Sequence, residues 1–285
     1  MEEIINNVVP YPVNEMDDYE ARYHLKELHD SLLEIMLEFD AFCRKNDIHY
    51  SIADGTLMGA LRHGDFIPWD DDADVMVTRT EYEKIMKAIR NEDNLKFLKI
   101  TFLDRITTEK YKSQKIYIDL FINEDMPASR FVFKWKKFKT ALLRNYFENN
   151  MRNVRHDNYS NLKHICYNIL RSVLGYLVRL FVGKRDIFEL NDKAVAIGSH
   201  KMSGIYTRYT SRMYETKRRF NKDSYEAGYA DVAFRGVKLM ALKSSDTFLR
   251  EMYGDYMKLL PEEKRVPEHA TNMMDSTGRR VKWLN

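Results

Sequence analysis

The chain has 285 residues, of which 44% are hydrophobic and 31% charged, and its formal net charge is +3. This length allows one large domain or two smaller ones around a buried core, and the composition excludes a disordered or fibrous protein. The acidic N-terminal stretch MEEIINNVVPYP is not followed by an apolar run, which argues against a secretory signal.

The first predicted element is one long amphipathic helix over Asp17–Asn46, because apolar residues recur there every three or four positions. A short strand is expected over Ile48–Ala53. A turn at Gly55-Thr56 then leads into a short helix, TLMGALRH. The two cysteines, Cys43 and Cys166, lie far apart without metal-site spacing, so we expect reduced thiols in a cytoplasmic protein.

Strands and helices continue to alternate up to about Asn123, which favours an α/β layer. ADVMV predicts a strand directly after an acidic run. Thr80 and Glu83 form a capping box that predicts a helix over about Glu81–Ile89. Two further strands are expected in LKFLKITF and KIYIDLFIN, which are rich in β-branched and aromatic residues.

The pattern changes after Pro127. Two basic helices are expected, in RFVFKWKKFKTALLRNYFENNM and LKHICYNILRSVLGYLVRLFVG. The C-terminal third predicts short strands in VAFRGVKLMAL, a helix around SDTFLREMY and a final loop, YGDYMKLLPEEKR. We therefore expect a catalytic core over residues 1–129, a basic helical segment over 130–190 and a C-terminal part over 191–285.

Four of the five residues from Asp70 to Asp74 are aspartates, in the order DDDAD. Alternate residues of a strand face the same side, so Asp72 and Asp74 are predicted to present their carboxylates together. Asp70 extends this row if the strand begins early enough, and Asp71 faces the other way. Carboxylates so close repel one another unless a cation lies between them, and hard oxygen ligands suit Mg²⁺ or Mn²⁺.

Asp119 is the single acid of the apolar run KIYIDLFIN, where an unpartnered charge is costly. An adjacent strand would bring it beside Asp72 and Asp74, completing a site for one or two metal ions. Taken alone, a buried strand aspartate is more typical of an ion pair with Lys or Arg, and DDDAD is equally typical of a solvated loop or a helix cap. The combination with Gly55-Thr56, whose backbone N–H groups suit phosphate oxygens, favours metal-dependent phosphoryl chemistry.

The stretch DGTLMGALRHGDFIPWDDDADV resembles the signature of the LicD family, which is related to fukutin and fukutin-related protein. IDLFIN resembles the family's later Asp-Ile-Phe segment, and YGDYMKLLPEEKR its C-terminal Tyr-Gly-Asp-Tyr element. The chain departs from the family at Leu260, where a proline is usual, and at Phe234–Gly236, where Phe-Glu-Gly is common. Residues 130–229 show no clear correspondence.

The resemblance implies a nucleotidyltransferase-like mixed sheet flanked by helices, an α/β (α+β) fold, with the basic helical region added to it. It implies transfer of phosphocholine from CDP-choline to a sugar hydroxyl of a glycan or lipid-linked glycan, such as teichoic acid, lipopolysaccharide or capsule, with release of CMP. The family's pattern places Gly55-Thr56 at the phosphate and Asp72, Asp74 and Asp119 at the metal. Family members also transfer ribitol phosphate, so another CDP-linked donor, carrying ribitol or glycerol, is an open alternative.

Several residues around this signature are further candidates. Asp70 or Asp71 is a candidate base for the acceptor hydroxyl. Arg62 and His63 follow the short helix and are candidate phosphate contacts, although ordinary surface charges explain them as well. Arg265 is another candidate phosphate contact, and a surface salt bridge with a nearby glutamate is an equal alternative.

The segment from Arg130 to Leu190 carries thirteen Lys or Arg residues against four acids, an excess of +9 that leaves the remainder of the chain at −6. ICYNILRSVLGYLVRLFV is too short and too charged for a membrane span and predicts an amphipathic helix. Its apolar face is expected either to pack on the catalytic domain or to attach peripherally to the inner membrane face.

Two other functions remain open at this point. The same aspartates would serve nucleotidyl transfer from an NTP, which releases pyrophosphate instead of CMP. A nucleic-acid-binding module would use the basic helices but leave the acids unexplained, and we expect no nucleic-acid partner.

Overall fold

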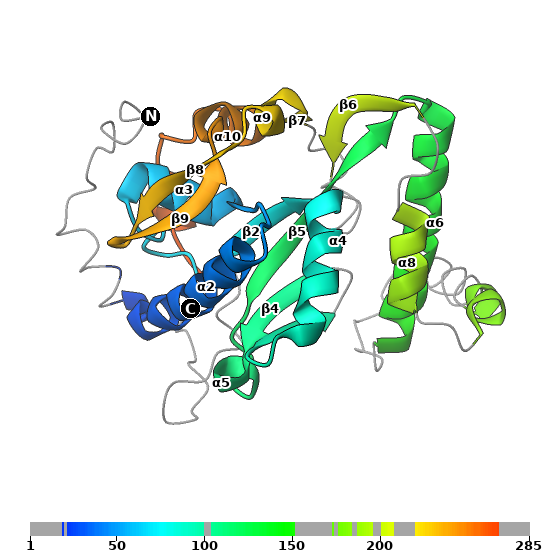
Figure 1. The fold of residues 1–285 in the computed structure, drawn as a ribbon, viewed down its shortest axis with the longest axis horizontal. Helices are drawn as coiled ribbons and strands as arrows, with labels where there is room; N and C mark the ends of the chain where they lie inside the picture. The colour runs from blue at the N-terminus through cyan, green and yellow to red at the C-terminus, as the bar shows by residue number, and fades with distance from the viewer. Residues whose placement is uncertain are drawn as a thin grey trace. The chain divides into compact units, whose positions relative to one another are not determined.

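The structure is a computed structural model that describes residues 19, 22–99, 104–151, 173, 176–183, 187–195, 201–207 and 220–267. The chain divides into two compact units: unit 1 consists of residues 1–123 and 219–285, and unit 2 of residues 124–218. Helices and strands mix throughout (Figure 1), which confirms the predicted α/β class. The predicted domain boundaries at residues 129 and 190 stay predictions.

Unit 1 is built on a mixed sheet in the order β1-β2-β5-β4-β3. The central strands β2 and β5 run parallel, and the other neighbours pair antiparallel. Central strands are covered on both faces, which explains why ADVMV and IDLFIN read as continuous apolar runs. The strand bounds are Ser51–Ile52 for β1, Asp74–Thr78 for β2, Leu95–Lys99 for β3, Asp104–Thr108 for β4 and Ile118–Pro127 for β5.

The helices of unit 1 pack on this sheet and on a separate hairpin of β8 and β9. Helix α2 contacts β4 and β9, α3 contacts β2 and β8, and α4 contacts β2. Their bounds are Lys26–Lys45 for α2, Asp54–His63 for α3, Arg79–Ala88 for α4, Glu109–Lys112 for α5, Asp223–Glu226 for α9 and Ser245–Tyr253 for α10. The remaining elements are the 3-10 helices η2 (Ile89–Asn91) and η4 (Glu262–Lys264) and the strands β7 (Phe220–Asn221), β8 (Tyr229–Phe234) and β9 (Val237–Leu242).

In the described part of unit 2, strand β6 (Met202–Thr207) pairs antiparallel with the end of β5, where Glu124 opposes Thr207. Helix α6 (Arg130–Met151) follows β5 and packs against α8 (Ile187–Val195). Helix α6 has the bounds that its sequence predicted. Residues 176–182 are also helical, but most of the second predicted basic helix lies outside the described residues.

The predicted long helix over Asp17–Asn46 is wrong in its N-terminal part. Tyr19 and Tyr23 lie in helical turns, but His24 has a left-handed φ of +53°, and α2 begins only at Lys26. The break lets both tyrosines bury their rings, and the ring of Tyr19 lies 5.0 Å from that of Trp69. Aromatic packing therefore outweighs continuation of the helix.

Three other local predictions change. The strand over Ile48–Ala53 shortens to Ser51–Ile52, and Gly55-Thr56 lies within the first turn of α3 instead of preceding it. Helix α4 is capped by Thr78, whose side chain accepts a bond from the Glu81 amide, two residues before the predicted cap. Strand β4, which the sequence did not predict, inserts between β3 and β5.

Candidate metal centre and surrounding residues

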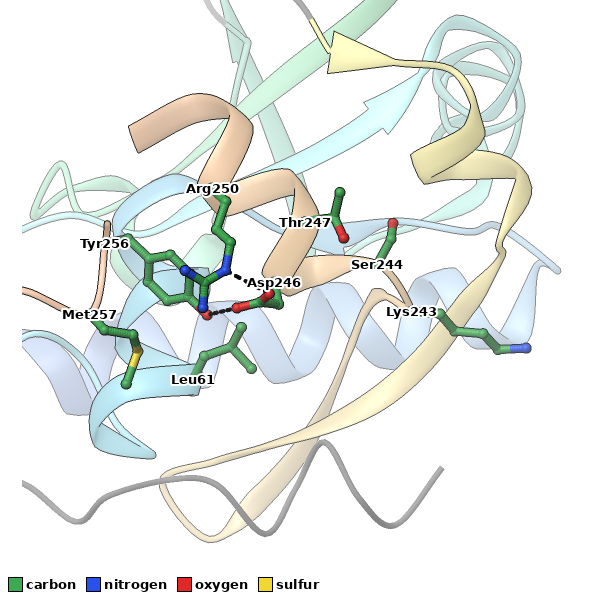
Figure 2. A pocket seen from close by; sticks show the side chains of 8 residues that line it. All are labelled: Leu61, Lys243, Ser244, Asp246, Thr247, Arg250, Tyr256 and Met257. Carbon is green, nitrogen blue, oxygen red and sulfur yellow. Dashed lines mark hydrogen bonds and ion pairs between the residues drawn. The ribbon is translucent and has the colours of Figure 1, made fainter. Parts of the chain in front are cut away.

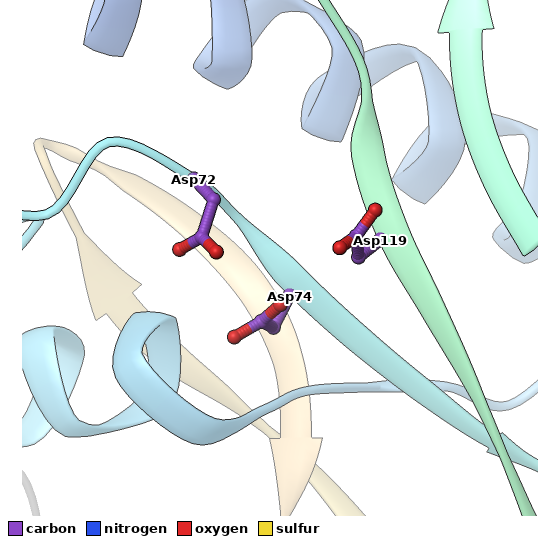
Figure 3. Close-up of side chains that lie close together, drawn as sticks. All are labelled: Asp72, Asp74 and Asp119. Atoms are coloured by element: carbon purple, nitrogen blue, oxygen red, sulfur yellow. The ribbon is translucent and has the colours of Figure 1, made fainter. Parts of the chain in front are cut away.

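Asp72, Asp74 and Asp119 bring their carboxylates together at one end of the two central strands. Each offers an oxygen, and these oxygens all lie within 4.8 Å of one another. Figure 3 shows Asp72 and Asp74 on one chain segment and Asp119 on the neighbouring strand, close to both. The three carboxylates that the sequence grouped together thus lie together in the structure, and their role as metal ligands stays a prediction at this point.

The register between the parallel strands β2 and β5 determines where two of the three carboxylates lie. Asp74, the first residue of β2, lies directly opposite Asp119, the second residue of β5. The Asp119 amide donates to the carbonyl of Ala73 at 2.8 Å. Because Ala73 lies between Asp72 and Asp74, this bond holds Asp119 level with both. Asp72 precedes the strand, so the prediction that Asp72 and Asp74 share one strand is corrected: only Asp74 lies in β2.

The first turn of α3 holds this edge of the sheet. The Asp74 amide donates to the hydroxyl of Thr56 at 2.8 Å. A Cβ on Gly55 would lie 2.3 Å from a carboxylate oxygen of Asp70, so a larger residue there would displace that carboxylate from the turn. A negative group near a helix N-terminus is electrostatically favoured. Gly55, Thr56 and Asp70 therefore brace the site, and their predicted roles in phosphate binding or as a base stay predictions.

Asp74 is buried and has several acidic neighbours. Burial, and then the charges of Asp72, Asp54, Asp119 and Asp70, raise the pKa of its carboxyl well above the usual range. Burial disfavours the ionised form and like charges add to this effect. A cation among these oxygens would relieve both costs, and carboxylate oxygens are the ligands that Mg²⁺ and Mn²⁺ prefer. The residues present therefore fit a divalent ion.

Asp119 also has an ion-pair partner that the sequence did not reveal. The Arg105 Nε on β4 lies 2.9 Å from its Oδ1, and both side chains are mostly buried. The Arg105 guanidinium lies 3.9 Å from the ring centroid of Tyr117, which restricts its movement. Both sequence-based interpretations of Asp119 are therefore represented: it pairs with an arginine and it lies beside two other carboxylates.

Comparison with known proteins places this site in a family. Residues 47–145 match the LicD/FKTN/FKRP nucleotidyltransferase domain, a range that contains all three carboxylates and Arg105. Over 266 residues the chain is 26% identical to the lipopolysaccharide cholinephosphotransferase LicD of Haemophilus influenzae, covering 86% of this chain and 96% of that protein. The chain thus carries a domain of the LicD/FKTN/FKRP type, and its similarity to LicD extends over most of its length. It is accordingly a phosphotransferase enzyme.

Two further relatives are uncharacterized proteins. One, from Rickettsia prowazekii, is 28% identical over 41% of this chain and 49% of its own length. The other, from Rickettsia typhi, is 34% identical over 34% of this chain and 28% of its own length.

Asp54, the first residue of the LicD signature, is a member of the site that sequence reasoning passed over. It is buried, has a left-handed φ of +44° and accepts a bond of 2.5 Å from the Tyr253 hydroxyl. Non-glycine residues rarely adopt this conformation, and surrounding structure must hold them in it. Tyr253 begins the family's C-terminal element, so this bond connects that element to the start of the DGTLMGALRHGDFIPWDDDADV signature.

Arg62 and His63 both lie at the C-terminal end of α3, where Arg62 is buried and His63 is partly exposed. The guanidinium of Arg62 is buried, donates from Nη1 to the Tyr256 carbonyl at 2.8 Å and from Nε to the His63 ring at 2.9 Å. Burial, and then the charge of Arg62, lowers the pKa of His63 to about 3, so its ring is neutral at ordinary pH. The structure gives both residues a bracing role, and their predicted contact with phosphate stays a prediction.

Arg265 lies against aromatic rings near the C-terminal element. Its guanidinium is 5.6 Å from the ring centroid of Trp69, its Nε donates to the Leu260 carbonyl at 2.7 Å, and its Nη1 donates to the Tyr19 hydroxyl at 3.2 Å. These contacts join the C-terminal loop to the segment before α2. The predicted phosphate contact of Arg265 remains untested.

The acidic residues of DDDAD thus separate into different environments. Asp71 is buried. The backbone carbonyl of Asp70 bonds the ring of the buried His29 at 2.7 Å, which anchors the loop on α2. The structure brings Asp72 and Asp74 to Asp119, while the carboxylate of Asp70 lies against Gly55 in the first turn of α3.

A cavity of about 450 Å³ lies between α3, α10 and the C-terminal loop (Figure 2). Two of its charged groups bond to each other: Asp246 accepts from Arg250 at 2.9 Å, and it also accepts from the Tyr256 hydroxyl at 2.8 Å. Lys243 points away from this network in Figure 2. Because these groups satisfy each other, the network braces the C-terminal loop on α10.

Proposed function

We propose that this chain transfers phosphocholine from CDP-choline to a hydroxyl of a cell-surface glycan, releasing CMP, with a divalent metal ion held by Asp72, Asp74 and Asp119. The convergence of these carboxylates on neighbouring strands carries the proposal. The choice of phosphocholine, and of lipopolysaccharide or a related glycan as acceptor, is supported by the similarity to the Haemophilus influenzae enzyme.

The chain's own residues would position the reactants. Asp74, fixed by its backbone bonds to Thr56 and Ala53, and Asp119, fixed in register opposite, offer oxygens from a rigid sheet, and Asp72 adds one from the loop. Bound Mg²⁺ would neutralise charge on the pyrophosphate of the donor. Phosphoryl transfer depends mainly on such positioning and neutralisation, so the protein needs no covalent nucleophile.

Arg105 is suited to a supporting role in the same site. Its Nε bonds Asp119, and its aromatic contact with Tyr117 holds the guanidinium plane beside the carboxylates. A guanidinium is a good partner for phosphate oxygens. We propose that Arg105 orients Asp119 and contributes positive charge beside the donor phosphates.

The direct test is Asp74→Asn, measured as CMP release from CDP-choline with Mg²⁺ present. We expect a loss of at least about 100-fold, because even residues that only support metal ligands cost 10–100-fold when changed. Asp93→Asn, at an exposed acid on unit 1, is the matched control and should keep full activity. Near-normal turnover by a folded Asp74→Asn protein would falsify the metal assignment.

The donor is tested separately. CDP-choline, CDP-ribitol and CDP-glycerol are compared for the rise in melting temperature that they cause in the presence of Mg²⁺, since a ligand of the folded state stabilises it by mass action. We expect CDP-choline to give the largest rise. Stabilisation by CDP-ribitol or CDP-glycerol alone would show that ribitol phosphate or glycerol phosphate is transferred instead of phosphocholine. Release of pyrophosphate from CTP would show that the enzyme transfers a nucleotidyl group.

A further inference from the structure

The outward face of α6 in unit 2 is aromatic. Phe131, Trp135 and Phe138 follow one another at spacings of four and three, which places them on one side of the helix. They are 77%, 50% and 51% exposed, whereas Lys136 and Thr140, elsewhere on the helix, are buried. The helix thus turns its largest apolar side chains toward solvent and buries a lysine.

Cations accompany these rings. Arg130, Lys134 and Lys139 are exposed on the same helix, and the Lys139 Nζ lies 5.5 Å from the ring centroid of Trp135. Trp135 and Phe138 stack with their ring centroids 5.7 Å apart. No acidic residue occurs in the sequence between Arg130 and Phe147. The surface is therefore both apolar and strongly basic.

A second helical segment of unit 2 has the same character. Over residues 176–182 it exposes four large apolar or aromatic side chains and one cation, Arg179. The four are Tyr176, Leu177, Leu180 and Phe181, between 46% and 78% exposed. We name Arg130, Phe131, Lys134, Trp135, Phe138 and Lys139 of α6 the basic aromatic surface.

Large exposed apolar patches on folded domains mark interaction sites. Aromatic rings on a helix flanked by Lys and Arg are typical of helices that lie in the headgroup region of a membrane, and the cations are complementary to anionic lipids. Within the described residues, no helix has the length and apolar character needed to cross a membrane.

We propose that the basic aromatic surface attaches the protein peripherally to a bilayer that contains anionic lipids. Trp135, Phe138 and Phe131 would enter the interface, and Lys134 and Lys139 would contact lipid phosphates. This inference goes beyond the proposed transfer reaction and does not depend on it. If the acceptor is a lipid-anchored glycan, the attachment would also raise the local concentration of acceptor.

The test uses the full chain and vesicles of phosphatidylcholine with or without phosphatidylglycerol. We expect co-sedimentation with the anionic vesicles at low salt and weaker binding at high salt, because exposed charges are screened. Lys134→Gln with Lys139→Gln should weaken binding about 25-fold, since each cation near an anionic surface contributes roughly fivefold. The matched control, Lys238→Gln with Lys258→Gln on exposed lysines of unit 1, should bind as the unchanged protein does.

The aromatic contribution has its own variant and readout. Phe131→Ser, Trp135→Ser and Phe138→Ser together should abolish binding while leaving CMP release from a soluble donor unchanged. Trp135→Phe should retain binding but lose the blue shift of tryptophan emission that vesicles cause. Failure of the unchanged protein to bind anionic vesicles at low salt overturns the proposal. A vesicle-independent dimer in light scattering, abolished by the triple substitution, would also overturn it by assigning the surface to a second copy.

Discussion

Arg105 lowers the electrostatic cost of placing three carboxylates together. Arg105→Gln removes the guanidinium whose Nε lies 2.9 Å from Asp119. Without metal, we expect the free energy of unfolding to fall by about 1.5–3 kcal/mol, the usual contribution of a hydrogen bond to a charged group. Mg²⁺ should then stabilise this variant more than it stabilises the unchanged protein, because Arg105 no longer competes for Asp119.

Urea unfolding in EDTA and in MgCl₂ measures both effects. Arg44→Gln is the matched control, because Arg44 makes ion pairs of 2.7 Å with Asp40 and Asp231 instead of with the carboxylate trio. It should lower stability by the same amount in both buffers. Equal Mg²⁺ increments in the Arg105→Gln variant and the unchanged protein would mean that Arg105 does not compete with the metal.

His63 makes stability depend on pH. Its pKa is about 3 in the folded protein and near 6.5 in an unfolded chain. The unfolded state therefore binds more protons below about pH 6.5, so stability is lost as the pH falls from there toward 3. Between pH 7 and pH 5 the loss is ~2 kcal/mol. His29, whose pKa burial also lowers, contributes in the same direction.

His63→Gln tests this contribution. Its carbonyl can still accept the bond from Arg62, but it does not titrate, so the unfolding free energy should fall by ~2 kcal/mol less between pH 7 and pH 5. Urea unfolding at the two pH values gives the difference. An unchanged slope in His63→Gln would show that the His63 ring takes up its proton over the same pH range in the folded and the unfolded protein.

At the scale of elements, α3 depends on a glycine that lets the metal-site loop approach. A Cβ on Gly59 would lie 2.5 Å from the backbone oxygen of Asp65 and 3.0 Å from the nitrogen of Ile67. Backbone atoms cannot move aside cheaply, and such overpacking costs about 1–3 kcal/mol. This exceeds the gain of up to about 1 kcal/mol that alanine brings to a helix interior.

Gly59→Ala should therefore lower the free energy of unfolding and also reduce CMP release, since the displaced loop leads to Asp72. Chemical denaturation and the CMP assay measure the two effects. Glu83→Ala, at an exposed position of α4, is the control for a neutral helix substitution. A more stable Gly59→Ala protein would contradict the close approach of loop and helix.

Prediction from sequence succeeds where one residue pattern has one structural solution. The middle of β2, Val75–Val77, and of β5, Leu120–Ile122, is apolar because both faces are covered, and the acid that precedes each run marks the site. The register that sets Asp74 opposite Asp119 depends on long-range pairing and is not readable from either strand. The same reason hides Arg105: β4 has only one strongly apolar residue, Ile106, so its segment does not look like a strand.

Local signals fail where two of them overlap. Thr78 and Glu81 form one capping pattern and Thr80 and Glu83 form another, two residues later. Sequence alone does not choose between them. The structure uses Thr78 because β2 ends there, paired with Asn123 of β5, and the helix must begin at once. In the same way, His24 interrupts a good helical pattern because Tyr19 packs on Trp69, a contact between residues 50 positions apart.

At the scale of the whole molecule, stability and metal binding are linked through Asp74. Its carboxyl has a raised pKa in the folded protein, so without metal the stability it contributes is present at low pH and is lost as the pH rises through that pKa. Mg²⁺ requires the ionised carboxylates and competes with the proton. The stabilisation by Mg²⁺ should therefore grow as the pH rises, in the same direction as the effect of His63.

Calorimetric melting of the full chain in EDTA and in MgCl₂, repeated across pH, measures this linkage. With free Mg²⁺ at 100 times its dissociation constant, the folded state gains about 2.7 kcal/mol. Asp119→Asn removes one ligand and should lose most of this gain, whereas Asp93→Asn should keep it. If the stabilisation by Mg²⁺ is the same at all pH values, or the same in Asp119→Asn as in the unchanged protein, the metal binds elsewhere. Arg105 would then be the partner that neutralises the three carboxylates.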